Sequence, residues 1–305
     1  MTPPSASARP ISIRPRRSVL YLPGSNARAL EKARELPADA LILDLEDAVA
    51  PEAKESARQM IAEAVRAGGF GHREVVVRVN GLDTPWGLAD VLAMARIGAD
   101  ALLFPKIQSP DDVRAAVAAL DRAGAPGSLP VWIMAETPRC ILDIDAIASA
   151  SHRLACIVAG TSDLTRELRA RHTASRDSVY TALSLIVLAA RAHGLDVLDG
   201  VHLDLGDEAG FAFTCEQGRN MGFDGRTLIH PKQIDLANRA FAPTGKELDL
   251  ARKVVAAWQE ARAAGKGICV VDNRLIEKLH VEEFERLLML DDAIAKRGAK
   301  SAAAA

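Results

Sequence analysis

The chain has 305 residues, of which 49% are hydrophobic and 26% are charged, and its formal net charge at pH 7 is -2. This balance is ordinary for a globular protein and argues against nucleic acid or a membrane surface as a partner. The four cysteines lie far apart and form no CxxC pair, which argues against a zinc site or a disulfide framework and predicts a cytoplasmic location.

The chain begins with a basic segment rich in Pro and Ser, residues 1–16, which we expect to be a disordered arm. Eight short apolar runs follow, each nearly continuous, as is typical of parallel strands that are covered on both faces. These runs begin at Ser18, Ala40, Glu74, Ala101, Val131, Leu154, Leu195 and Arg226. Helical patterns separate the runs, such as the one that opens on Pro51 and closes on Gly68.

Eight strands alternating with helices predict an α/β fold, the (β/α)8 TIM barrel. The alternative is an open doubly wound sheet, but no GxGxxG follows the first strand and no GxxxxGK[ST] occurs. We therefore predict a barrel over residues 17–264, a C-terminal helical lid segment over 265–297 and a disordered tail over 298–305. The longest apolar run, within residues 179–192, is too short to span a bilayer.

Polar side chains follow the strands at their carboxyl ends, the end of a (β/α)8 barrel that carries the active site and is called the rim below. The polar residues that end strands two to six include Asp44, Glu46, Asp47, Arg78, Lys106, Glu136 and Asp163. Several carboxylates suit a hard cation such as Mg²⁺, and an arginine matches a carboxylate bidentately. The rim therefore predicts a site for a small oxo- or hydroxy-acid. The alternative is a set of salt bridges that closes the barrel top.

Ordered motifs along the chain, from about residue 17 to about residue 288, resemble the citrate lyase beta-subunit-like branch of the HpcH/HpaI aldolase family. These motifs include LYLPGSN, LILDLEDAVAPEAKESAR, VVVRVNGLDTPWGLADV, LLFPKIQS, IMAETPRCI, AGTSDLTRELRAR and GFDGRTLIHPKQIDLANRAFAPT. The resemblance implies a barrel, Mg²⁺ with Mn²⁺ as an alternative, coenzyme A as part of the substrate, and a homotrimer or hexamer. It implies an enzyme, a carbon–carbon lyase that reversibly cleaves malyl-, methylmalyl-, citramalyl- or citryl-CoA to an acyl-CoA and a 2-oxo acid.

The resemblance also implies roles for rim residues. Glu136 of AETP and Asp163 of TSDL would be the metal ligands, and Arg78 of RVN would bind the substrate carboxylate. Glu46, Lys106 and Glu136 are expected to contact the substrate. Asp44 and Asp47 are expected to take catalytic parts, and Asp44 is preferred because it comes first after the apolar run.

Two positions depart from the family pattern. Ser162 stands where many relatives have an acidic residue, and Glu277 stands where Asp is usual in a C-terminal motif. In the family this motif lies over the neighbouring subunit's site, so the lid segment is expected to cover that site and Glu277 to act as a catalytic acid.

No compact motif for coenzyme A occurs in the sequence. The predicted contacts are Arg17 and Arg28, which flank the first strand, and Lys54 and Arg58. The last two follow the acidic cluster of Asp44, Glu46 and Asp47. Three other functions remain open: a malyl-CoA-type thioester hydrolase, a pyruvate-type class II aldolase, and a citrate lyase beta subunit that depends on a partner.

Overall fold

The computed structural model describes residues 13–303, which form two compact units. The first unit is Arg16–Phe241, and the second contains the chain from Ala242 onward. Each is described by itself. The predicted disordered arm lies for the most part in residues 1–12, outside the described residues.

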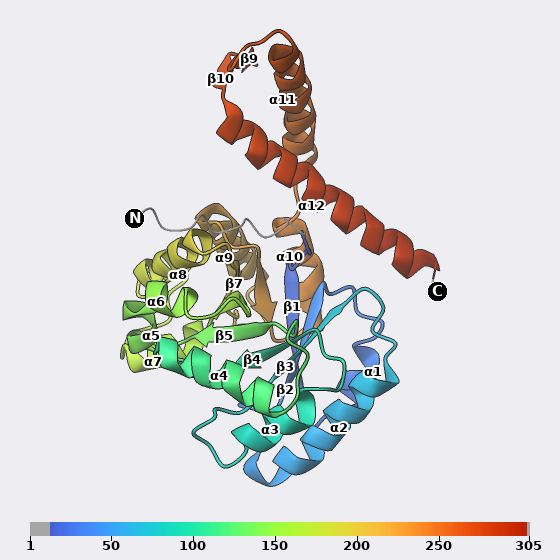
Figure 1. Cartoon of the computed structure of the whole chain (residues 1–305), viewed down its shortest axis with the longest axis vertical. Helices are drawn as coiled ribbons and strands as arrows, with labels where there is room; N and C mark the ends of the chain where they lie inside the picture. The colour runs from blue at the N-terminus through green and yellow to red at the C-terminus, as the bar shows by residue number, and fades with distance from the viewer. Residues whose placement is uncertain (1–12, 304–305) are drawn as a thin grey trace. The chain divides into compact units, whose positions relative to one another are not determined.

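The first unit is a closed barrel of eight parallel strands, in which each strand pairs with the next in sequence and β8 pairs with β1 (Figure 1). The strands are β1 (Ser18–Pro23), β2 (Ala40–Asp44), β3 (Glu74–Arg78), β4 (Ala101–Phe104), β5 (Val131–Ala135), β6 (Leu154–Ala159), β7 (Asp196–Asp199) and β8 (Gly225–Leu228). The predicted (β/α)8 barrel and its eight strands are confirmed.

Helices connect successive strands and cover the outside of the barrel (Figure 1). They are α1 (Ala27–Lys32), α2 (Lys54–Ala67), α3 (Gly87–Met94), α4 (Pro110–Arg122), α5 (Pro138–Leu142), α6 (Ile144–Ala148), α7 (Thr161–Glu167), α8 (Tyr180–Ala192), α9 (Glu208–Met221) and α10 (Ile234–Ala240), with 3-10 turns η1 (Pro51–Ala53) and η2 (Pro231–Gln233). Local sequence sets several of these starts. Ser109 and Asp112, for example, form a capping box with Pro110 in the first turn of α4.

Side chains along each strand alternate between the inside of the barrel and the layer under the helices, because successive residues of a strand point to opposite faces. One buried cluster fills the inside and includes Ile42, Val76 and Met134. A larger cluster, which includes Leu41 and Leu43, packs under the helices. The residues two positions after the inner three are Asp44, Arg78 and Glu136, so the same alternation turns these polar side chains toward the barrel axis.

The amino-terminal end of the barrel is closed by a charged network. Arg16 is buried, donates to both carboxylate oxygens of Glu74 at 2.6 and 2.7 Å, and also pairs with Asp196. Its guanidinium lies 4.9 Å from the ring centroid of Trp132, which fills the bottom of the interior. Arg16 therefore belongs to the barrel, and the arm predicted over residues 1–16 ends before it.

The second unit contains α11 (Gly245–Ala263), a hairpin of β9 (Cys269–Val271) and β10 (Arg274–Ile276), and α12 (Lys278–Ala303). The hairpin turn places Asp272 and Asn273 at φ of 46° and 62°, a left-handed conformation that Asp and Asn tolerate. A small core of Val254, Val271, Ile276 and Val281 joins these elements.

Two boundaries in this part differ from the prediction. The compact barrel ends at Phe241 rather than at residue 264, because α11 packs on α12 and β9. The tail predicted to be disordered from residue 298 is helical as far as Ala303. None of the helices that the structure describes has both the length and the apolar character needed to cross a membrane.

Candidate active site

Arg78 lies at the end of β3 and is held by the neighbouring end of β2. Its Nε and Nη2 each donate at 2.7 Å to one carboxylate oxygen of Asp44, which is fully buried. The same two oxygens also accept the backbone N–H groups of Glu46 and Ala48 at 2.9 and 3.0 Å. Asp44 therefore has no oxygen left for a substrate, and it orients Arg78 rather than reacting. The predicted bidentate fork of Arg78 is occupied by this internal partner.

The remaining nitrogen of Arg78, Nη1, faces Glu46 and Asp47. It lies 2.9 Å from a carboxylate oxygen of Glu46 and 3.6 Å from one of Asp47. The Tyr21 ring lies 4.8 Å from the guanidinium carbon of Arg78. Burial raises the pKa of Glu46 to about 7, although Arg78 opposes the shift. Glu46 can therefore exchange a proton near neutral pH.

A second cluster joins the ends of strands β4, β5 and β6. The ammonium of Lys106 lies 2.8 Å from Asp163 and 3.4 Å from Glu136, so it is shared by two carboxylates. The other oxygen of Asp163 pairs with Arg166 at 2.6 Å. The backbone N–H of Lys106 also donates to Glu136 at 2.8 Å, in a left-handed conformation with φ of 54°. Gly160 passes so close to Glu136 that a Cβ there would lie 2.3 Å from the Glu136 Cβ.

The electrostatics of this pair suit a cation. Burial raises the pKa of Glu136, which Lys106 partly offsets. Burial also opposes ionisation of Asp163, but the hydrogen bond and charge of Lys106 lower its pKa overall. Two carboxylates that already share one cationic group are a donor set that Mg²⁺ takes together with water and substrate oxygens. The two residues therefore fit the ion. Among the described residues, no group of three or more His, Cys, Asp and Glu side chains is placed to hold a metal.

Three of the four residues predicted to contact coenzyme A have internal partners. Arg17 precedes β1, so it lies at the opposite end of the barrel from the rim, where it pairs with Asp39. Lys54 is buried under the acidic cluster, and Arg58 donates to the buried Asp90 at 2.8 Å. Arg17 was predicted to contact coenzyme A because it flanks the first strand. The direction of that strand puts the residue before it at the end of the barrel opposite the rim.

The fourth residue, Arg28, is exposed on α1, just after β1 reaches the rim. Its role in binding coenzyme A stays a prediction. Glu277 is exposed between β10 and α12, and its backbone N–H donates to His280 at 3.0 Å. It belongs to the second unit, and its catalytic role also stays a prediction.

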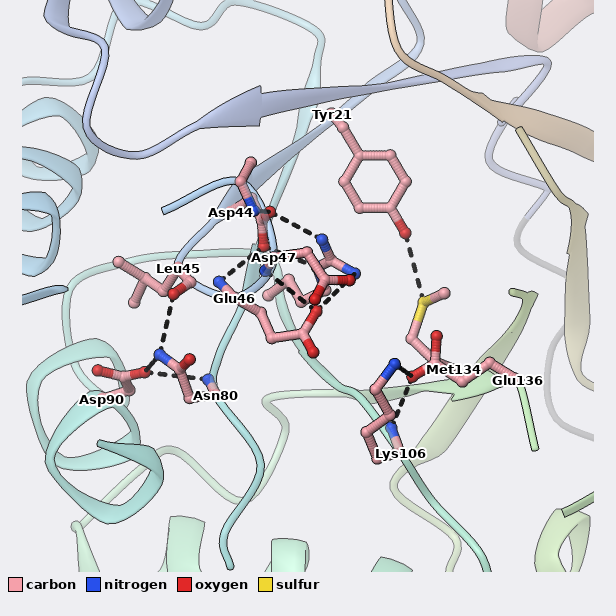
Figure 2. A network of polar contacts seen from close by, with 12 residues as sticks. Tyr21, Asp44, Leu45, Glu46, Asp47, Asn80, Asp90, Lys106, Met134 and Glu136 are labelled. Carbon is pink, nitrogen blue, oxygen red and sulfur yellow. Dashed lines mark hydrogen bonds and ion pairs between the residues drawn. The ribbon is translucent and has the colours of Figure 1, made fainter. Parts of the chain in front are cut away.

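Sequence reasoning missed two residues that shape the site. Tyr21 covers the Arg78 guanidinium, and its hydroxyl donates to the Met134 sulfur at 3.3 Å (Figure 2). Asp90 on α3 is fully buried and accepts from Asn80 and Arg58. Side chains alternate between the inside and the outside of the barrel along β1, and this alternation could have identified Tyr21 as an inward-facing residue. A charged residue on the buried side of the amphipathic α3 could have identified Asp90.

The model of the family described as HpcH/HpaI aldolase/citrate lyase matches residues 17–231. The chain belongs to this family. A relative named (3S)-malyl-CoA thioesterase, from Cereibacter sphaeroides, is 47% identical over 92% of this chain and 96% of its own length. Citrate lyase subunit beta of Escherichia coli is 37% identical over 90% of this chain and 92% of its own length.

A solved structure is similar over most of the chain. CitE from Mycobacterium tuberculosis, in complex with magnesium, acetoacetate and coenzyme A, matches with a TM-score of 0.72 and 27% identity, over 92% of this chain and 99% of that one. The names of these relatives are those of enzymes, a thioesterase of malyl-CoA and a subunit of citrate lyase. The barrel with its rim is the part of this chain that the family model covers.

Proposed function

We propose that the protein hydrolyses the CoA thioester of a short 3-hydroxy dicarboxylic acid, of the malyl-CoA kind, with Mg²⁺ as cofactor. The observation that carries the proposal is the presence on one rim of Arg78 and of the Glu136–Asp163 pair. The 47% identical relatives named malyl-CoA thioesterase support hydrolysis. The sequence alone favoured C–C cleavage, with hydrolysis as an alternative. The higher identity to relatives named malyl-CoA thioesterase than to those named citrate lyase subunit beta favours hydrolysis in this proposal.

Arg78 would bind the carboxylate of the acyl group through Nη1, which Asp44 does not contact. Its two N–H groups would be shared between Glu46 and the substrate. Because Asp44 holds Nε and Nη2, the guanidinium cannot rotate away from the rim. The Tyr21 ring on one face of Arg78 further limits its motion, as a cation–π contact would. Arg78 therefore orients the acyl group before reaction, which lowers the entropic cost of reaching the transition state.

Glu136 and Asp163 would hold the metal. When bound, Mg²⁺ supplies Lewis-acid polarisation of the substrate oxygens. Lys106 keeps Glu136 oriented through its backbone N–H and contributes a positive charge to the same region. These two carboxylates and Lys106 thus recognise the oxygen-rich end of the substrate.

Glu46 is the group best suited to accept a proton. Its pKa of about 7, raised by burial, matches a general base that works near neutral pH. In hydrolysis it would take a proton from water as the water oxygen bonds to the thioester carbonyl carbon. The carbon–sulfur bond would then break, and coenzyme A would leave as the thiolate. The exposed Asp47 beside it adds negative charge that favours proton uptake by Glu46.

A second candidate is the lyase reaction on the same substrate. The 33–37% identical relatives named citrate lyase subunit beta support it, as does the CitE complex with magnesium, acetoacetate and coenzyme A. The same proton acceptor would then take the proton of the 3-hydroxyl group, and the bond between C2 and C3 would break. The electron pair of that bond would leave with C2 as a thioester enolate, which would take up a proton to give the acyl-CoA. Malyl-CoA would yield acetyl-CoA and glyoxylate.

The test supplies malyl-CoA to the purified protein, with Mg²⁺ and with a chelator. Free thiol together with malate supports hydrolysis, whereas acetyl-CoA with glyoxylate supports the lyase. Citramalyl-, methylmalyl- and citryl-CoA in parallel assays define the acyl group. Absence of turnover of every free thioester, with activity restored by an acyl-carrier partner, would refute the proposal in favour of a partner-dependent subunit.

A further inference from the structure

Residues 45–48, called the acidic loop, carry Glu46 and Asp47 from the end of β2 to Arg78. The backbone of this loop is fixed from below by Lys54, the first residue of α2. The Lys54 ammonium donates to the carbonyl oxygens of Leu45 and Glu46 at 2.8 and 2.7 Å. The carbonyls of two successive loop residues therefore converge on one buried cation.

The third partner of the Lys54 ammonium is the side-chain oxygen of Asn80, at 2.8 Å. An ammonium has three N–H donors, so this contact completes its set. The Lys54 side chain is buried, and the Trp86 ring lies 5.2 Å from its nitrogen. With all three donors engaged inside the barrel unit, Lys54 has none to offer a phosphate of coenzyme A, which was its predicted partner.

Asn80 extends the network to α3 (Figure 2). Its side-chain N–H₂ donates to the carbonyl of Leu45 at 2.9 Å and to Asp90 at 2.6 Å. Asp90 also accepts the backbone N–H of Asn80 at 3.0 Å and the Nε of Arg58 at 2.8 Å. A connected set of buried polar groups of this kind holds one geometry, because breaking any bond leaves an unpaired group.

We propose that Lys54 is a positioning residue, which fixes the backbone of the acidic loop so that the Glu46 carboxylate stays within 2.9 Å of Arg78 and at the reacting end of the substrate. This inference rests on the proposed function for its effect on activity. The three hydrogen bonds of the Lys54 ammonium go to Leu45, Glu46 and Asn80, and not to Arg78 or the proposed metal ligands. Lys54 therefore acts through the carbonyl groups of the loop.

The test is Lys54→Met, which keeps the length of the side chain and removes the ammonium. Misplacing a reacting group by about 1 Å costs on the order of 100-fold in rate, so kcat is expected to fall by about that factor. KM is expected to change little. The same loss is expected with a malyl thioester of pantetheine, which lacks the nucleotide phosphates. A loss confined to KM for the CoA ester, and absent with pantetheine, would overturn the inference in favour of phosphate binding.

Arg153→Met is the matched control. Arg153 is also a buried cation that donates to backbone carbonyls, those of Leu129 and Pro126, but it precedes β6 and so lies at the end of the barrel opposite the rim. Both variants are expected to lower Tm, and only Lys54→Met to lower kcat. Equal effects of the two variants on kcat would refute a positioning role. If Lys54→Met does not fold, Asn80→Ala removes one of the three partners of the Lys54 ammonium. It is expected to give the same pattern with a smaller loss.

A second readout is independent of the reaction. Amide hydrogen exchange in the acidic loop is expected to accelerate in Lys54→Met and to stay unchanged in Arg153→Met. If the wild-type protein turns over no thioester and its acidic loop exchanges fast, both the proposed function and the positioning role of Lys54 are refuted. If it turns over no thioester but the loop exchanges slowly and Lys54→Met accelerates the exchange, the proposed function is refuted and the positioning role is supported.

Discussion

Replacing Asp44 with Asn tests the central contact of the site. Each Asp44 oxygen accepts one N–H of Arg78 and one backbone N–H. In Asp44→Asn, the side-chain N–H₂ group would replace one of these oxygens and would face N–H groups that need an acceptor. Both partners are buried, with side-chain exposures of 1% for Asp44 and 8% for Arg78. Removing one partner of such a pair costs about 3–5 kcal/mol. For a domain of this size, that lowers Tm by roughly 6–20 °C.

The assay is thermal unfolding by circular dichroism together with kcat/KM for malyl-CoA. Asp39→Asn is the control, because Asp39 forms a similar two-oxygen pair with Arg17 at 2.8 and 3.0 Å, at the other end of the barrel. Asp39→Asn is expected to lower Tm and to retain activity, whereas Asp44→Asn is expected to lower both. A change in Tm below about 2 °C for Asp44→Asn, or equal losses of activity in the two variants, would refute the assignment of Asp44 as the residue that holds Arg78.

The other predictions concern the carboxylates of the rim. Glu136→Gln is expected to raise the Kd for Mg²⁺ at least about tenfold in calorimetric titration, since a charged ligand is lost, and an unchanged Kd would remove it as a ligand. Gly160→Ala is expected to weaken Mg²⁺ binding without changing any charge, because its Cβ would lie 2.3 Å from the Glu136 Cβ. The rate kcat/KM is expected to fall below about pH 7 as Glu46 takes up a proton, and a flat profile there would exclude it as the base. The pKa of Glu46 in the fold lies above the ordinary 4.5. The stability that Glu46 contributes is therefore present at low pH and lost as pH rises through about 7. Glu46→Gln is expected to raise the free energy of unfolding at pH 8 but not at pH 4.5.

The sequence predicted the barrel well because its signal is repetitive. Eight apolar runs of similar length, each followed by a helical pattern, leave few arrangements other than a closed parallel barrel. The rim residues followed from the same pattern. Asp44 and Arg78 are the last residues of buried strands, and Glu136 directly follows one. All three lie two positions after residues of the inner cluster, so strand direction and side-chain alternation bring them together at one end.

The partners of individual cations could not be predicted in the same way. Lys54 and Arg17 are both positive residues near apolar strands, and their spacing does not say whether a carbonyl, an aspartate or a phosphate lies opposite. Lys54 binds loop carbonyls and Arg17 binds Asp39, contacts that depend on how a helix or a strand start packs in three dimensions. The boundary at Phe241 was missed for a similar reason, because α11 has an ordinary amphipathic pattern and its packing partner is α12.

The apolar middle of the barrel separates two charged layers, the rim and the network around Arg16 and Asp39. From Asp39 to Asp44 the strand runs five residues, about 16 Å at the usual rise. Free-energy changes at sites more than about 7–10 Å apart generally add. Thermostabilising substitutions around Arg16 or Asp39 can therefore be combined with specificity changes at the rim, and their effects on folding and on turnover are expected to be separable in an engineered variant.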